Sequence, residues 1–385
     1  MNFIFASTST FEPWDWTNPE TQGIGGSETS HIEMARRLSE HGHVVYSYSP
    51  TPGTKPVVGP GGVLWDHIDN VDLNKKGVWV VYRDPDFAAR IPRDGNVIWL
   101  ICQDVDYNAI GGKLGLNHIT SQHLDRIVTL CPDHGRYMKI RHKEAVDKVC
   151  VSSNGIKVEV IDDVLNDPPK RNPRRLIYAS SPDRGLLSLL AIFQRAREIV
   201  TDLELHVYYG FDNIQKIIDK YGEGNPTAQN ARRVQKALRE TEGVEWHGRI
   251  GQTALAREWA MSGIWCHPSI FTETSCITCM DAQALGAIPI TTPLWAVKDN
   301  VQHGVFIDGD AQRDPLTRAR YVLELIRLAQ DEERQEKIRA EMMPWAKAHF
   351  SWERFVDQWE GWAKQDTKSK SDPWVVSNAQ EEVMA

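Results

Sequence analysis

The sequence lacks any uninterrupted run of about 18 apolar residues, the length that a membrane-spanning helix needs. We therefore expect no transmembrane segment. Residues 1–6 are too short and too uncharged to resemble a signal peptide, and they are predicted to form a first strand. These features favour a cytoplasmic protein, with peripheral contact with a membrane surface left open.

Cysteine is also scarce, with six residues scattered along 385. This usage favours reduced, buried thiols over a disulfide framework. Cys276 and Cys279 have the spacing of a redox or zinc motif, but no second pair completes a zinc site. We interpret them as two packed thiols near the start of a helix and expect no metal.

Neither half of the chain has an excess of basic residues. The 44 Lys and Arg against 52 Asp and Glu give a net charge of −8, of which residues 1–160 carry −3 and residues 161–385 carry −5. A dedicated duplex-binding surface needs a local excess of Lys and Arg. The balance counts against a nucleic-acid partner, although it leaves a local patch open.

Short apolar runs alternate with helical patterns over the first 150 residues. Strands are predicted near residues 44–47, 78–82, 97–101 and 126–130, and a helix over 27–41. His31, on this helix, is interpreted as solvated or capping. Short apolar strands separated by helices indicate a parallel sheet that is covered on both faces.

The pattern stops at Asn154-Gly155 and restarts after a segment that contains three prolines. We therefore predict an α/β fold with two Rossmann-like domains, and ligands bound beyond the carboxyl ends of the strands. The predicted parts are an N-terminal domain (1–160), a linker (161–175), a C-terminal domain (176–345), a helix returning to the N-terminal domain (346–366) and a polar tail (367–385).

Two glycine-containing turns precede predicted helices. The first holds Gly25, Gly26 and Glu28, and the second holds Ser181 and Arg184. Free amides at a helix start attract anions, and an arginine can grip a diphosphate through two hydrogen bonds. The first turn matches neither a dinucleotide fingerprint nor a P-loop. Each turn alone is equally consistent with an ordinary capped helix.

The most informative segment covers residues 268–289. Glu273 lies in a loop after a strand, Thr274 and Ser275 open a predicted helix over 275–285, and Asp281 follows eight residues after Glu273. That spacing is about 12 Å along a helix. Two acids that flank an anion-binding helix start suit two hydroxylated groups joined by a diphosphate, as in a nucleotide sugar. The alternative is that both acids are capping or solvated charges.

Taken together, these segments resemble the retaining glycosyltransferases of the GT-B fold, family four. The resemblance rests on Glu273-x7-Asp281 with the Ala-Leu-Gly-Ala-Ile-Pro that follows, on residues 244–248, on residues 181–186, and on the Gly25-Gly26-Ser27-Glu28 and Asn154-Gly155-Ile156 landmarks. It covers nearly the whole chain. It implies two Rossmann-like domains whose parallel sheets face a central cleft, with C-terminal helices, the first domain taking the acceptor and the second the donor.

The resemblance also implies an activity. A sugar, expected to be a hexose, moves from a nucleotide diphosphate donor, expected to be UDP- or GDP-linked, to a hydroxyl acceptor such as a glycan. The anomeric configuration is retained, and neither a metal nor a separate cofactor is expected. Three alternatives stay open: a nucleotide-sugar epimerase or hydrolase of the same fold, sugar transfer onto a hydroxymethylated nucleic-acid base, and a non-catalytic sugar- or nucleotide-binding protein.

Site residues carry over position by position. Glu273 matches the acid that contacts the donor sugar, and Asp281 matches the acid that holds the ribose, although the family has the longer Glu there. Gln103 stands where the family usually has His, so only a neutral hydrogen-bonding role survives. The implied catalytic residues are Glu273, Arg184 and Gln103; the implied donor-binding residues are Asp281, Thr274, Ser275, Cys276, Ile277, Ser181, Arg249, Gly25 and Gly26; the candidates for the acceptor side are Trp14, Trp16 and Glu28. For Trp14 and Trp16, anchoring the loop that follows the first strand is the open alternative.

Overall fold

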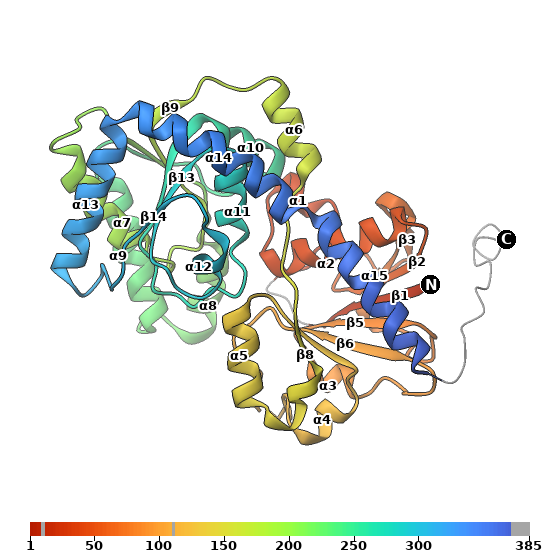
Figure 1. Ribbon diagram of the computed structural model, residues 1–385. Coiled ribbons are helices and arrows are strands. Elements are labelled where there is room, and N and C mark those ends of the chain that lie inside the picture. The colour runs from red at the N-terminus through yellow and green to blue at the C-terminus, as the bar shows by residue number, and fades with distance from the viewer. Residues whose placement is uncertain (9–11, 110–111, 371–385) are drawn as a thin grey trace. The chain divides into compact units, whose positions relative to one another are not determined.

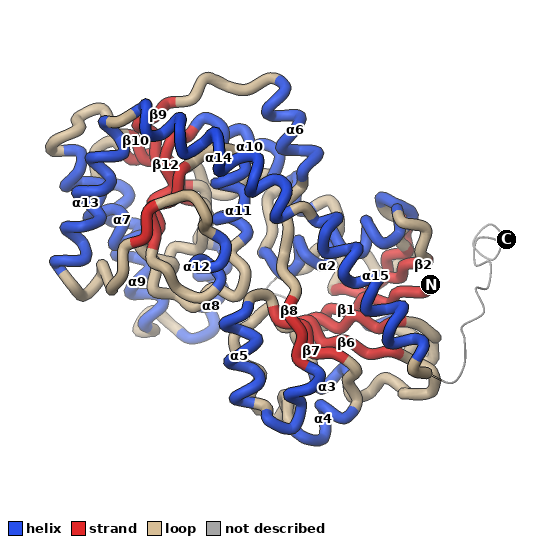
Figure 2. Tube along the Cα trace, viewed as in Figure 1, coloured by secondary structure: helices blue, strands red, loops and turns tan. Residues whose placement is uncertain are grey.

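The computed structural model describes residues 1–8, 12–109 and 112–370. The chain divides into two units. Unit 1 contains residues 1–18, 24–155 and the segment from Trp352 onward, and unit 2 contains residues 19–23 and 156–351. Each unit has its own sheet, with helices against it (Figures 1 and 2).

The described strands of unit 1 form one sheet in the order β3-β4-β2-β1-β5-β6-β7-β8. All neighbouring pairs are parallel except β3 with β4. The strands are β1 (Asn2–Ser7), β2 (Val44–Ser49), β3 (Val57–Val58), β4 (Leu64–His67), β5 (Val78–Tyr82), β6 (Val97–Ile101), β7 (Arg126–Thr129) and β8 (Val149–Val151). The helices are α2 (Gly26–Glu40), α3 (Pro85–Ala88), α4 (His118–Gln122), α5 (Pro132–Arg141) and α15 (Trp352–Lys368), while α1 (Asn18–Thr21) spans a point where the chain passes from one unit to the other.

Alternation along the strands of unit 1 fills a core on each face of its sheet, because successive side chains of a strand point to opposite faces. Phe3 and Phe5 of β1 join the cluster that includes buried residues of α2 and α15, whereas Ile4 and Ala6 join the cluster on the other face. Helix α15 packs against α2 and β6. The C-terminal helix therefore completes the core of the N-terminal unit.

Unit 2 repeats this architecture, with a described sheet in the order β11-β10-β9-β12-β13-β14 and every pair parallel. The strands are β9 (Asn172–Tyr178), β10 (Glu204–Val207), β11 (Val244–Trp246), β12 (Ser262–His267), β13 (Ile288–Thr291) and β14 (Val305–Phe306). The helices are α6 (Val158–Asn166), α7 (Leu186–Arg197), α8 (Asp212–Tyr221), α9 (Pro226–Glu240), α10 (Gln252–Met261), α11 (Ile277–Ala284), α12 (Ala296–Asn300), α13 (Pro315–Gln330) and α14 (Glu332–Phe350).

Two predicted boundaries are wrong. The expected linker 161–175 contains most of α6 and the start of β9, because Ile161 and Val164 are buried on one side of α6 and tie it to unit 2. The predicted helix 346–366 spans the end of α14 and most of α15. These helices are separated at Ser351, whose backbone is extended (φ −55°, ψ 132°).

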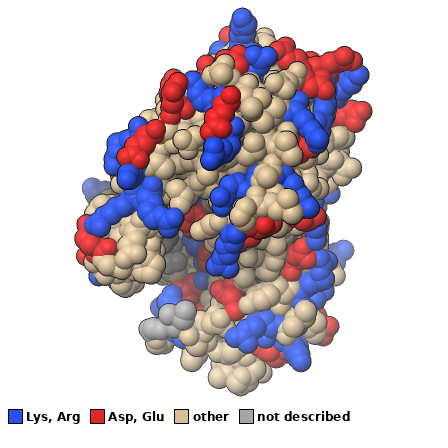
Figure 3. All heavy atoms as spheres, turned by 90° about the vertical axis from the view of Figure 1, so that its left-hand side faces the viewer, with Lys and Arg blue, Asp and Glu red and all other residues tan. Residues whose placement is uncertain are grey.

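Surface charge is mixed in sign. On the face shown in Figure 3, Lys and Arg side chains lie beside Asp and Glu side chains. None of the helices in the described part of the chain combines the length and the apolar character needed to cross a lipid bilayer.

Candidate functional site

The order in which strands are added to the unit 2 sheet reverses between β9 and β12. From β9 the chain first adds β10 and β11 on one side, and it then returns to place β12 on the other. In open parallel sheets the carboxyl end of such a switch point is where ligands bind. The turn after β9 carries Ser181 and Arg184, and the loop after β12 carries Glu273. Two segments that the sequence predicted separately therefore meet.

Arg184 and Glu273 form the centre of this group. The Nε atom of Arg184 lies 3.3 Å from Oε1 of Glu273, and its guanidinium also pairs with Asp183 at 2.5 Å. The Arg184 guanidinium lies over the ring of Phe271, 3.0 Å from its centroid. Burial raises the pKa of the Glu273 carboxyl, and the charge of Arg184 opposes that rise. Arg184 therefore places a positive charge beside the Glu273 carboxyl, which is largely shielded from water.

Gly185 allows this close approach. Its backbone is left-handed (φ 88°), and a Cβ atom there would lie 2.6 Å from the carbonyl oxygen of Pro268. Only glycine adopts this conformation without strain and leaves room for the other chain segment. Gly185 therefore brings the start of α7 against the loop that carries Glu273.

Helix α11 begins two residues later than predicted, at Ile277. Thr274 and Ser275 precede it as buried loop residues. Cys276 is the N-cap and has a left-handed backbone (φ 63°), a conformation that costs a non-glycine residue energy and tends to occur at functional sites. Within the described residues, the buried Oγ of Ser275 has no hydrogen-bond partner. The first amides of any helix also lack intrahelical partners, so polar donors converge here.

Asp281 lies on α11 and is half-buried. Burial raises the pKa of its carboxyl to about 7, against the opposing charge of Lys157. The Lys157 ammonium is itself 3.0 Å from Glu20. Asp281 is therefore poised between its neutral and charged forms near neutral pH, a state expected of a group that gains a partner when a ligand binds.

Tyr209, after β10, is a site residue that the sequence analysis missed. Burial raises the pKa of its hydroxyl, while a hydrogen bond from Ser181 and the charges of Arg249 and Arg184 lower it. Arg249 donates a hydrogen bond to the carbonyl of Gly23 at 2.7 Å. Tyr209 thus contacts Ser181 and lies within the electrostatic influence of Arg249. The available signal was the Tyr-Tyr-Gly sequence at residues 208–210, at the end of an apolar run.

In unit 1, the predicted residues lie at the carboxyl ends of neighbouring strands. Arg83 donates two hydrogen bonds of 2.7 and 2.6 Å to Asp104, and its Nη1 atom is 3.9 Å from Oε1 of Glu28. Burial raises the pKa of Glu28, and Arg83 opposes that rise. Gln103 and Asn154 exchange amide hydrogen bonds of 3.3 and 3.4 Å. Sequence reasoning missed Arg83, which has a left-handed backbone (φ 66°).

Helix α2 begins at Gly26 with Gly25 as its N-cap. A Cβ atom on Gly25 would lie 2.5 Å from a carboxylate oxygen of Glu28. That carboxylate occupies the region where an anion would approach the helix start. The phosphate contact predicted for the two glycines stays a prediction, and the charge of Glu28 works against it.

Two predictions about unit 1 are wrong. Trp14 is fully buried, with its ring edge-on to His31 and Trp65, so it anchors the loop and cannot stack on an acceptor. His31 is neither solvated nor capping. Its ring nitrogens contact the hydroxyls of Ser7 (2.9 Å) and Ser47 (2.7 Å), and burial lowers its pKa to about 3.

Trp16 stays a candidate for the acceptor side. It is half-buried and packs against Trp65 with ring centroids 5.4 Å apart.

Neither a protein-family model nor a curated protein sequence matches this chain. Solved structures do. The catalytic domain of starch synthase IV from Arabidopsis thaliana, bound to ADP and acarbose, is 14% identical, with a TM-score of 0.64 over 95% of this chain and 99% of that domain. Sucrose-phosphate synthase from Thermosynechococcus elongatus is 11% identical, with a TM-score of 0.63 over 96% and 100%.

The α,α-trehalose-phosphate synthase (UDP-forming) from Burkholderia vietnamiensis is 10% identical, with a TM-score of 0.62 over 97% and 98%. At these identities the likeness concerns the fold. The predicted α/β fold of the GT-B type, with two parallel sheets, is confirmed.

Proposed function

We propose that this protein is a glycosyltransferase that moves a sugar from a nucleotide diphosphate donor to a hydroxyl acceptor. The observation that carries the proposal is the Arg184–Glu273 pair at the switch point of the unit 2 sheet. It places a cation and a hydroxyl-binding acid together where a parallel sheet binds ligands. Retention of configuration, a hexose as the transferred group, a glycan acceptor and independence from metal belong to the same proposal through the family resemblance.

The charge of each residue determines which part of the donor we expect it to bind. As the donor bond breaks, negative charge grows on the leaving diphosphate, and fixed donors must stabilise it. Arg184, the α11 amides and the buried hydroxyl of Ser275 supply such donors. Diphosphate binding gives the Ser275 hydroxyl the partner that it lacks within the described residues. Glu273 accepts hydrogen bonds from the donor sugar.

The second acid serves the nucleoside. Asp281 accepts hydrogen bonds from the ribose hydroxyls, and Arg249 with Tyr209 completes the basic and aromatic lining. Two of the similar structures support the diphosphate class, since one is described as bound to ADP and the other as UDP-forming. UDP- and GDP-sugars remain the donors that we expect for this chain.

A screen of nucleotides tests the donor class. Ligands that bind the folded state raise the melting temperature by mass action, so UDP, GDP, ADP, CDP and dTDP are compared with and without their sugars. We expect one base to stand out. A chain that no nucleoside diphosphate stabilises would contradict the proposal.

Turnover is then measured with the selected donor and a panel of sugar acceptors, with the anomeric configuration of the product read by NMR. Glu273→Gln is expected to abolish transfer while the fold is preserved, and Glu198→Gln, at an exposed position, serves as the matched control. Turnover of the donor without acceptor would instead indicate a hydrolase, if nucleotide is released, or an epimerase, if the nucleotide sugar is isomerised. Binding without any turnover would indicate a sugar- or nucleotide-binding protein.

A further inference from the structure

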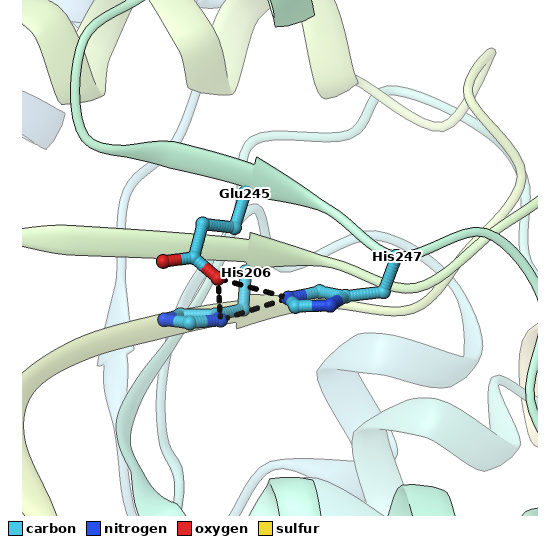
Figure 4. Close-up of side chains that lie close together, drawn as sticks. All are labelled: His206, Glu245 and His247. Carbon is cyan, nitrogen blue, oxygen red and sulfur yellow. Dashed lines mark hydrogen bonds and ion pairs between the residues drawn. The ribbon is translucent and has the colours of Figure 1, made fainter.

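Three potential metal ligands converge at the edge of the unit 2 sheet. Glu245 and His247 project from β11 and the turn after it, and His206 projects from the neighbouring β10 (Figure 4). His206 and Glu245 are paired in register, and His247 follows Glu245 by two residues, directly after the end of β11. Since side chains two residues apart share a face of a strand, all three lie on the same face.

The separations match a small coordination sphere. The Nδ1 atom of His206 is 3.0 Å from Nε2 of His247, and Oε2 of Glu245 is 3.8 Å from the former and 3.7 Å from the latter. Ligand atoms around a tetrahedral zinc ion, at bonds of about 2.0–2.2 Å, lie about 3.3–3.6 Å apart. Shifts of a few tenths of an ångström convert one arrangement into the other.

We propose that His206, Glu245 and His247 bind one Zn²⁺ ion, or a divalent transition-metal ion of the same class, which cross-links the edge strand β11 to β10. Two imidazoles and one carboxylate are a donor set that suits zinc and leaves the fourth position to water. Glu245 is 67% exposed and His247 32% exposed at the side chain, so an ion reaches the site from solvent.

Neighbouring side chains fix the orientation of the His247 ring. The ring of His247 stacks on Tyr208 with centroids 4.5 Å apart and an angle of 7° between the planes. The Tyr208 hydroxyl is itself held by Arg175 and Glu258.

A second carboxylate, that of Glu204, lies near the nitrogen of the His206 ring that does not face the proposed metal ion. Oε2 of Glu204 lies 3.7 Å from Nε2 of His206. When the metal binds, the hydrogen bond between the two rings opens, the rings tilt toward the ion, and each ring carries its proton on its other nitrogen. Nε2–H of His206 then faces Glu204, an outer carboxylate of the kind that orients metal-bound histidines.

Calorimetric titration of chelator-treated, tag-free protein with ZnCl₂ tests the proposal. We expect one tight site in the wild type, a large loss in Glu245→Gln and His247→Gln, and a loss of about tenfold in Glu204→Gln. His41→Gln is the control, because His41 belongs to the other cluster of metal-ligating groups found among the described residues, with Asp357 and Glu360. It is expected to leave the tight site unchanged.

Titration with Co²⁺ gives a second readout, since its visible absorption is intense in tetrahedral sites and weak in octahedral ones. Intense absorption in the wild type that disappears in His247→Gln supports the site. The proposal is overturned if the wild type shows no tight binding, or if Glu245→Gln and His247→Gln bind zinc as tightly as the wild type. A loss of binding confined to His41→Gln also overturns it. None of these measurements uses sugar transfer, so their outcome is independent of the proposed function.

Discussion

Replacement of Asp281 by Asn should make the ligand-free protein more stable at neutral and alkaline pH. Burial raises the pKa of this carboxyl from 3.8 to about 7. A shift of about 3 units corresponds to about 4 kcal/mol of differential stabilisation between the two protonation states. Asp281 is half-buried, so solvent screens part of this cost, and we expect roughly 2 kcal/mol.

The sign of the pH dependence follows from the raised pKa. The folded protein keeps the Asp281 proton at pH values where the unfolded chain has lost it, so wild-type stability falls as pH rises from about 4 to about 7. Asn has no proton to lose. The stability gap between Asp281→Asn and wild type should therefore be small near pH 4 and should grow to its full size by about pH 8.

Thermal denaturation of both proteins between about pH 5 and pH 8 measures this gap, with Asp163→Asn, an exposed position on α6, as the matched control. For a unit of about 200 residues, 2 kcal/mol corresponds to roughly 4–8 °C in melting temperature. The same variant should bind its nucleoside diphosphate about tenfold more weakly, because charge-assisted hydrogen bonds are the stronger ones. A gap that does not grow with pH would refute the burial argument, and unchanged nucleotide affinity would remove Asp281 from the ribose site.

Three further predictions concern neighbouring features. Arg184→Ala should raise the dissociation constant of the free nucleoside diphosphate at least tenfold by calorimetry, since a charged hydrogen bond contributes about 1.5–3 kcal/mol; an unchanged constant would place the phosphates elsewhere. Gly185→Ala should cost about 1–3 kcal/mol in chemical denaturation, because its Cβ would meet the Pro268 carbonyl at 2.6 Å in a left-handed backbone, and wild-type stability would refute the close packing. Trp14→Ala should cost about 3–5 kcal/mol, as expected for a fully buried aromatic ring, whereas a loss below about 1 kcal/mol would contradict its place in the core.

The central strands were predictable because they are buried on both faces. Their residues therefore form short, continuous apolar runs, as in residues 78–82 and 97–101, which match β5 and β6. The short strands β3 and β14 were not predicted. Each has two residues, and Val57 and Val58 of β3 are exposed, so neither strand carries a burial pattern.

The errors come from contacts between distant segments. The expected linker looked like a loop because it contains three prolines and many charges, yet Ile161 and Val164 give α6 an apolar side that packs in unit 2. His31 looked like a surface residue on a polar helix. Ser7 and Ser47, from two different strands, contact both of its ring nitrogens and make its burial possible.

From six scattered cysteines and the lack of long apolar runs, the sequence predicted reduced thiols and no membrane-spanning helix. Local periodicity predicted two α/β halves. Motifs that directly follow strands had to lie at the carboxyl edge of a parallel sheet, whatever its strand order. Strand order itself depends on long-range packing, which no local pattern encodes. Only the adjacency of β9 and β12 brings Arg184 to Glu273, and only the pairing of β10 with β11 sets His206 beside Glu245.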